Sequence, residues 1–187
     1  MKTKKRETAA EFMARLHGDP EWVRKNAECE ARTKALEARF DAEERPILND
    51  LAEVGCTVSS VWDLVNSSAS YPHAIPVLLK HLQQPYHPRI LEGIVRALTV
   101  KEARGAPAHE ILDELKRRTV PSPSDDRPAP EGVQGMPRGD VRWALANALT
   151  VVADASMINE IKALVRDDCY QDMKERLETA LKNLGAG

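Results

Sequence analysis

A helical pattern that recurs three times constrains the fold of this chain more than any other feature. Each copy is apolar at positions i, i+4, i+7 and i+8, which places four side chains on one face of an α-helix. The copies comprise Ile90, Ile94, Ala97 and Leu98; Val141, Leu145, Ala148 and Leu149; and Met173, Leu177, Ala180 and Leu181. An amphipathic stretch precedes each copy, over 75–82, 111–115 and 158–165. The sequence therefore predicts three helical hairpins in tandem.

One proline-rich segment explains the uneven spacing of the three copies. The copies begin 51 and 32 residues apart, and the excess of 19 residues equals the length of the segment 119–137. That segment contains Pro121, Pro123, Pro128, Pro130 and Pro137. Prolines at this density are incompatible with a helix or a packed core. We therefore predict a loop over 119–137 inside the second hairpin.

The region before the repeats is predicted to form highly charged helices. Acidic residues lie four positions ahead of basic ones, as in Glu21 and Lys25, a spacing that supports a solvated helix. Pro46 is expected to kink or split this helix. A two-stranded coiled coil is one interpretation, and an amphipathic helix laid on the repeats is the one we favour. The predicted domains are an N-terminal helical cover, 1–58, packed on a repeat domain, 59–187.

The flanks of the three copies predict which end of the stack is covered. The first copy has Leu91 and Val95 beside its apolar stripe, whereas the third has Lys174 and Glu178. Apolar side chains beside the stripe must be covered by another helix to be shielded from water, whereas a terminal repeat carries a polar outer face. We therefore expect the N-terminal helices to cover the first hairpin and the last hairpin to form a polar cap.

The segment GDVRWALANAL, residues 139–149, closely resembles the second helix of a HEAT-like repeat. In that family an Asp-x-Arg pair at the start of the helix helps to join adjacent repeats, and Asp140 and Arg142 match it. The other copies depart from the pattern, with Arg89 in place of the Asp and Lys174 in place of the Arg. The resemblance implies an all-α fold, a short α-solenoid of HEAT-like helical hairpins similar to small bacterial HEAT-repeat proteins.

Composition and charge narrow the classes of function. A net charge of −2 and a pI near 6.2 disfavour a nucleic-acid binder, which needs an excess of cations to displace phosphate counterions. Cys29, Cys56 and Cys169 are widely spaced, as in the reduced proteins of the cytoplasm. No apolar run is long enough to span a membrane and the N-terminus lacks a signal peptide pattern, so we expect a cytoplasmic protein without a membrane partner.

The outward face of the second helices is the predicted binding surface. In a solenoid these helices line the inner, concave side, and the side chains opposite the buried stripe face a ligand. The candidate partner-binding residues are Arg89, Glu92, Arg96, Asp140, Trp143, Asn147, Glu175 and Thr179. Trp143 is either a binding anchor or is covered by the proline-rich loop or the N-terminal helices.

The sequence shows no pattern typical of a catalytic or metal site. The five histidines form no i, i+4 pair and have no nearby cysteine. His109 and Glu110 are similar to one His–Glu dipeptide of the HEAT-like deoxyhypusine hydroxylases, a family that needs several to hold a di-iron centre. No Ser/His/Asp set or phosphate-binding glycine loop is present. We therefore expect no catalytic residue, no metal and no cofactor.

These observations predict a non-catalytic protein–protein interaction module that binds an unidentified protein partner through the concave face of the second helices. A specific form, suggested by analogy of fold, is an immunity- or antitoxin-like inhibitor of a partner enzyme. The alternative is a HEAT-like nucleic-acid-acting enzyme of the glycosylase or lyase type, which needs a basic concave cleft with Trp143 exposed beside Asp140. We expect a monomer or a weak homodimer formed through the long N-terminal helix.

Overall fold

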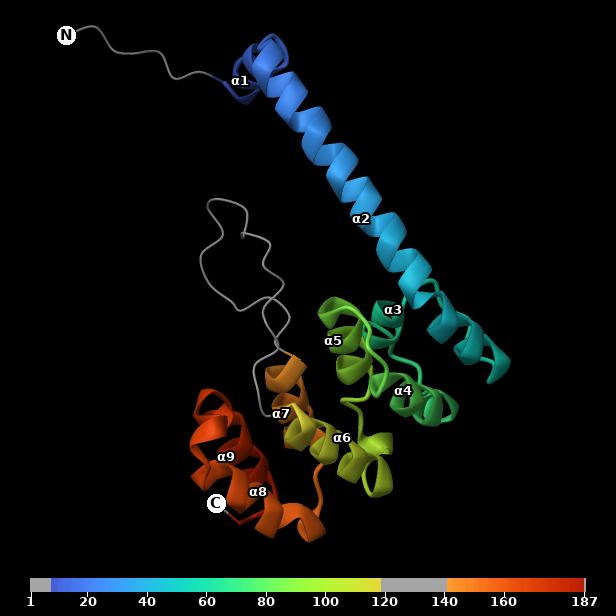
Figure 1. Ribbon diagram of the computed structural model, residues 1–187, viewed down its shortest axis with the longest axis vertical. Helices are drawn as coiled ribbons and strands as arrows, with labels where there is room; N and C mark the ends of the chain where they lie inside the picture. The colour runs from blue at the N-terminus through green and yellow to red at the C-terminus, as the bar shows by residue number, and fades with distance from the viewer. Residues whose placement is uncertain (1–7, 119–140, 187) are drawn as a thin grey trace, which may run out of the picture. The chain divides into compact units, whose positions relative to one another are not determined.

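The computed structural model describes residues 8–118 and 141–186, and over these ranges the chain is helical without any strand. The predicted all-α fold is therefore confirmed, whereas the predicted loop over 119–137 lies outside the described residues. The α-helices are α1 (Ala9–His17), α2 (Pro20–Glu53), α3 (Val61–Val65), α4 (Ile75–Leu82), α5 (Pro88–Ala97), α6 (Ala106–Arg117), α7 (Val141–Val152), α8 (Ile158–Arg166) and α9 (Lys174–Asn183) (Figure 1). Short 3₁₀ helices are η1 (Pro72–Ala74), η2 (Lys101–Ala103), η3 (Ala155–Met157) and η4 (Asp168–Met173).

The chain divides into two compact units, Met1–Ala42 and Glu43–Gly187. No described residue of the first unit is buried, whereas Ile47 and Leu51 of α2 are fully buried in the second. The end of α2 therefore folds with the hairpins, and this division differs from the predicted boundary after residue 58. The helix is not split at Pro46, a solvent-exposed position where water can bind the carbonyl that lacks a donor.

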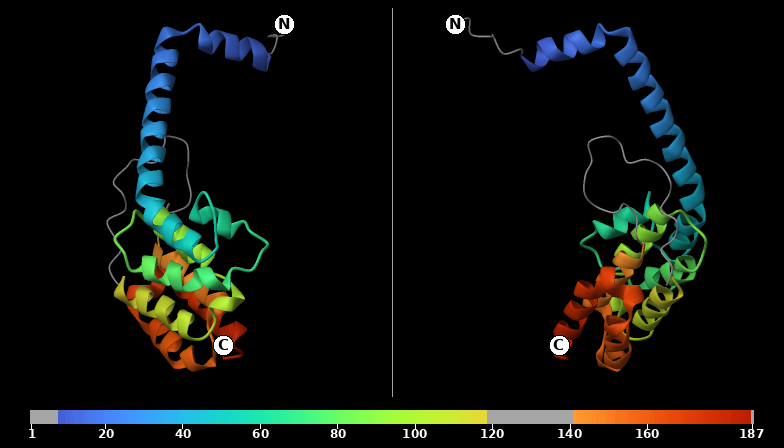
Figure 2. Two further views of the ribbon diagram at one scale, coloured as in Figure 1. Left: turned by 90° about the vertical axis from the view of Figure 1, so that its right-hand side faces the viewer. Right: turned by 60° about the vertical axis from the view of Figure 1, so that its left-hand side comes forward.

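Three helical hairpins follow one another in the second unit: α4–α5, α6–α7 and α8–α9 (Figures 1 and 2). Helix α5 packs against α3 and α7, and α7 packs against α5 and α9. The helices therefore form two rows: the first comprises α3, α5, α7 and α9, and the second comprises α4 and α6, with α8 joined to α6 by the ion pair between Lys116 and Glu160. Every residue of the three predicted apolar stripes is buried, with 5% or less of its surface exposed.

The two ends of the first row differ as their flanking residues predict. Leu91 on α5 is buried, and α3, which belongs to the predicted repeat domain, is one of the helices that pack against α5. This approach favours a glycine, because a Cβ atom at Gly93 would lie 3.0 Å from Trp62 Nε1, a tight contact that the indole could relieve only by moving. Lys174 and Glu178 on α9 are exposed and give that end a polar surface.

Two consecutive glutamates of α2 accept hydrogen bonds from the starts of two other helices. The buried Glu44 Oε1 accepts from the Val61 amide at 2.6 Å and from Ser60 Oγ at 3.0 Å, at the start of α3. Glu43 Oε1 accepts from the His87 amide at the start of α5. Carboxylates stabilise helix N-termini because the helix dipole and the unpaired amides favour negative charge. These bonds join the end of α2 to the first row.

Candidate functional site

Seven of the eight predicted partner-binding residues lie on consecutive helices of one row, and the eighth, Asp140, lies outside the described residues. The seven are Arg89, Glu92 and Arg96 on α5, Trp143 and Asn147 on α7, and Glu175 and Thr179 on α9. Glu92, Trp143 and Glu175 occupy the position directly opposite the buried stripe of their helices, and the other four lie beside them. We call these seven residues, together with Arg176 of α9, the second-helix surface.

Trp143 keeps 37% of its surface exposed, and an arginine from the next helix lies over its ring. The Arg176 guanidinium carbon is 5.2 Å from the ring centroid, within the range of a cation–π interaction. Helix α9 thus covers one side of the Trp143 ring, a contact that was not among the alternatives predicted from the sequence. Arg176 lies three positions after Met173, the first residue of its stripe. The equivalent positions in the other two copies hold Gly93 and Ala144, so the repeat pattern did not predict an arginine beside Trp143.

A second tryptophan–arginine pair lies at the α3 end of the row. The Arg96 guanidinium carbon is 5.7 Å from the Trp62 ring centroid. Arg96 also pairs with Glu92, since its Nε and one terminal nitrogen lie 2.9 and 2.8 Å from Glu92 Oε1. Glu92 thus holds the guanidinium in position over the ring. Arg96 and Glu92 were predicted from the sequence as partner-binding residues, whereas Trp62 was not.

A small hollow of about 240 Å³ adjoins Arg96. Its walls come from the end of α3, the serine-rich turn that follows and the end of α5. Ser70 Oγ donates to Glu102 at 2.7 Å, and the Tyr71 hydroxyl donates to the Ala97 carbonyl at 2.9 Å. The hollow is smaller than typical small-molecule pockets, which occupy about 300–1,000 Å³.

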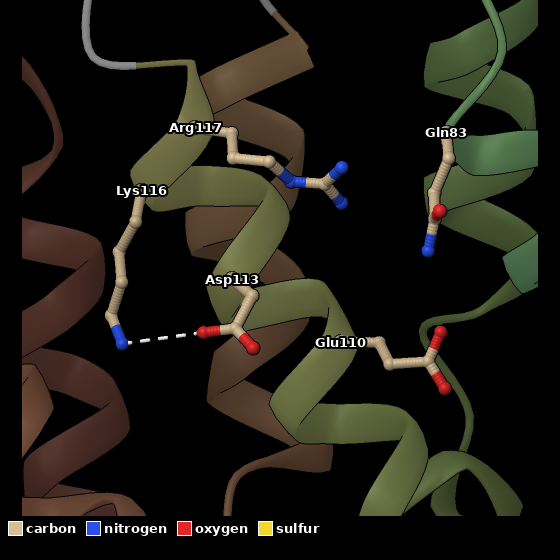
Figure 3. A pocket seen from close by; sticks show the side chains of 5 residues that line it. All are labelled: Gln83, Glu110, Asp113, Lys116 and Arg117. Carbon is tan, nitrogen blue, oxygen red and sulfur yellow. Dashed lines mark hydrogen bonds and ion pairs between the residues drawn. The ribbon is translucent and has the colours of Figure 1, made fainter.

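A larger hollow of about 520 Å³ lies at α6 and the end of α4 and is lined by charged side chains (Figure 3). Glu110 and Arg117 point to the same side of α6 as Gln83, while Lys116 lies on the other side of the helix. Lys116 bonds Asp113 and the α8 residue Glu160, and the bond to Glu160 raises the pKa of the lysine. Lys116 lies 3.4 Å from Asp113, and Arg117 pairs with Glu114 of the same helix, so both cations at this hollow already have carboxylate partners.

A buried histidine joins α2 to α4. His81 Nε2 lies 2.9 Å from Asp50 Oδ2, and His81 Nδ1 lies 2.8 Å from the Tyr86 hydroxyl. Lys80 Nζ donates to the same Asp50 oxygen at 2.6 Å. An acid–base histidine needs one ring nitrogen directed at a reactant. Both nitrogens of His81 bond protein groups, so the geometry fits a structural connection.

This cluster predicts how stability depends on pH. The hydrogen bond from Lys80, followed by that from His81, lowers the pKa of the Asp50 carboxyl. A lowered carboxyl pKa stabilises the fold above the unfolded value of about 3.9, and the gain is lost as pH falls through the folded value. We therefore expect the stability advantage of the wild type over Asp50→Asn to shrink as the pH falls below about 4.

Urea unfolding midpoints at about pH 6 and about pH 3 measure this effect. The difference in urea midpoint between the wild type and Asp50→Asn should be smaller at about pH 3 than at about pH 6. The variant Asp113→Asn, at a carboxyl with 66% of its side chain exposed, serves as the control. An equal difference in urea midpoint at both pH values would contradict a lowered pKa of the Asp50 carboxyl in the folded protein.

A histidine, a serine and an aspartate also meet, in an order that differs from a catalytic triad. His109 Nε2 lies 3.0 Å from Ser156 Oγ, and Ser156 Oγ donates to Asp154 Oδ1 at 2.5 Å. Asp154 also accepts from the Ser156 amide at 2.9 Å and so caps η3. In a triad the histidine takes the serine proton and the carboxylate orients the histidine. Here the serine proton faces the carboxylate, so this group is a helix cap joined to α6.

Over the two described ranges, no group of three or more His, Cys, Asp or Glu side chains is placed to hold a metal ion. Among the same residues, no helix combines the length and apolar character needed to cross a membrane. Comparisons with models of known protein families, with curated proteins and with solved structures found no match. The functional interpretation therefore rests on the geometry of the second-helix surface.

Proposed function

We propose that this chain is a protein-binding module that recognises a partner protein through the second-helix surface. In this proposal the three hairpins form a short HEAT-like solenoid, and α5, α7 and α9 present their outward side chains to the partner. The observation that carries the proposal is the exposed Trp143 ring with Arg176 over it. A large aromatic held at the surface of a packed helix is typical of a binding anchor.

The packing around Trp143 supports this role. Helix α7 buries Leu145 and Leu149 on its opposite face, so the backbone under the tryptophan is fixed before binding. Arg176 restricts the ring from one side. A preorganised side chain loses little conformational entropy on binding, and tryptophan and arginine are enriched among the residues that dominate interface affinity.

The charges of the second-helix surface favour a protein over a nucleic acid. Its basic residues are Arg89, Arg96 and Arg176, and its acidic residues are Glu92 and Glu175. Arg96 is already paired with Glu92. Phosphate binding draws its affinity from an excess of cations, which this mixed set does not offer. The glycosylase or lyase alternative is therefore less well supported by the described residues.

A more specific form of the proposal is an immunity- or antitoxin-like inhibitor that blocks a partner enzyme. It rests on analogy with small repeat proteins and on the rigid surface described above. If a toxin-like enzyme is encoded beside this gene, its activity should fall on addition of this chain. Full activity at an excess of the chain would exclude that enzyme as the target.

Truncation of the anchor tests the proposed function. We expect Trp143→Ala to weaken binding of the captured partner about 30-fold, the effect of a residue worth about 2 kcal/mol at an interface. Affinity capture from the native cell identifies the partner, and titration calorimetry with the purified partner measures the change. Arg176→Ala should weaken binding about fivefold through loss of the cation–π contact.

The control is Phe12→Ala, which removes an aromatic side chain of similar exposure, 44%, from the first unit. This variant should bind the partner as the wild type does. Circular dichroism confirms that each variant is folded. Equal affinity of Trp143→Ala and the wild type would show that the partner binds elsewhere.

A further inference from the structure

A stripe along the first part of α2 repeats every seven residues. Its members alternate at spacings of four and three, the pattern of the d and a positions of a coiled coil. They are Trp22, Asn26, Cys29, Thr33, Leu36 and Phe40, with Trp22, Cys29 and Leu36 at d and Asn26, Thr33 and Phe40 at a. The next a position is Ile47, which is fully buried in the second unit.

Over residues 20–42 this stripe is not packed in a core. No residue of the stretch is buried; Trp22, Leu36 and Phe40 are half-buried, and Cys29 is exposed. The stretch is about 34 Å long at the usual helical rise. A helix of this length in water gains most of its stability from packing an apolar face against another element.

The charges that flank the stripe identify a second copy of the chain as its partner. One flank, the g positions, carries Lys25, Arg32 and Arg39, and the other, the e positions, carries Glu30 and Glu37. In a parallel pair, each g residue faces the e residue five positions later on the other strand. Lys25 would then face Glu30, and Arg32 would face Glu37, with opposite charges in every case.

An antiparallel pair of the same helices is disfavoured by these charges. There g faces g and e faces e, so bases would meet bases and acids would meet acids. Within one helix Lys25 pairs with Glu21 at 2.9 Å, but both side chains are about two-thirds exposed, so this ion pair offers little competition.

We propose that residues 20–42 form a parallel two-stranded coiled coil with a second copy of this chain. Asn26 at an a position favours two strands in one register, because its amide can pair with the amide of the second copy in place of its exposed hydrogen bond to Glu30 Oε1, which is 2.6 Å long. Cys29 at d lies opposite Cys29 of the second copy, at a separation that a disulfide can bridge. Because the stripe contains polar residues and the paired helices are short, this dimer is weak and reversible. The proposal is independent of the partner-binding function.

The test uses the full chain and two charge variants, studied by sedimentation equilibrium. The acidic variant carries Lys25→Glu and Arg32→Glu, and the basic variant carries Glu30→Lys and Glu37→Lys. Each variant alone places like charges at the two facing pairs of residues 25 with 30 and 32 with 37, so its dimer should be on the order of tenfold weaker than that of the wild type. An equimolar mixture restores opposite charges and should dimerise as the wild type does, which also shows that both variants are folded.

Oxidation supplies a second readout of the register. In a chain with Cys56→Ala and Cys169→Ala, mild copper-phenanthroline oxidation should yield a covalent dimer through Cys29. The matched chain that keeps only Cys169, an exposed cysteine of the second unit, should remain largely uncrosslinked. A monomer at all concentrations up to about 1 mM would overturn the proposal. A dimer that neither charge variant weakens would also overturn it, since an antiparallel pair or another surface behaves in that way.

Discussion

Glu44→Ala is expected to destabilise the second unit by about 3 kcal/mol. The carboxylate accepts two hydrogen bonds at one oxygen, from the Val61 amide and from Ser60 Oγ. Val61 is fully buried, so its amide would lose its acceptor without gaining water. A buried donor left unpaired costs the full desolvation of that group, in addition to the charge-assisted bonds that are lost.

The other amides at the start of α3 have their own acceptors, which makes this effect specific to Glu44. Asp63 accepts from the Ser59 and Ser60 amides, and Ser60 Oγ accepts from the Trp62 amide. Glu44→Gln retains an oxygen acceptor and should cost only about 1 kcal/mol. Urea unfolding followed by circular dichroism measures both variants, and Glu53→Ala, an exposed glutamate of the same helix, is the control. Equal stability of Glu44→Ala and Glu53→Ala would show that this cap is not important for stability.

The hairpin helices could be predicted from the sequence because their apolar side chains repeat at helical spacing. Ile94, Leu145 and Leu177 each lie at the same place in a stripe, and each is fully buried. Burial of such residues depends on local periodicity, which one sequence contains in full. The same periodicity identified α5, α7 and α9 as helices that present polar side chains on their opposite faces.

The polar partners could not be predicted, because each depends on how distant segments pack. Arg176 over Trp143 joins two helices, and Glu44 reaches the start of α3. His109 and Ser156 meet across 47 positions of the chain. No local pattern specifies which outward side chains of neighbouring helices face each other. The residues of the candidate site could therefore be predicted from their positions on the helices, whereas the contacts between them could be seen only in the structure.

A buried arginine joins the second hairpin to the third and explains why α7 and η4 stay together. Arg142 has 5% of its side chain exposed, donates to the Cys169 carbonyl at 2.5 Å and lies over the Tyr170 ring at 5.7 Å. The resemblance to HEAT-like repeats implied a joining role for this residue. The contact does cross from one hairpin to the next, whereas its predicted partner Asp140 lies outside the described residues.

Arg142→Ala is therefore expected to destabilise the second unit by about 3–4 kcal/mol, through the lost hydrogen bond and the cavity left beside Tyr170. Arg142→Met fills much of that cavity without the charge and should cost about half as much. Asp172→Asn should cost less than about 0.5 kcal/mol, because Asp172 is 54% exposed and lies 3.8 Å from the guanidinium. Urea unfolding of the three variants tests this order. If Asp172→Asn cost as much as Arg142→Ala, the ion pair would hold the hairpins together, and the buried stack on Tyr170 would not.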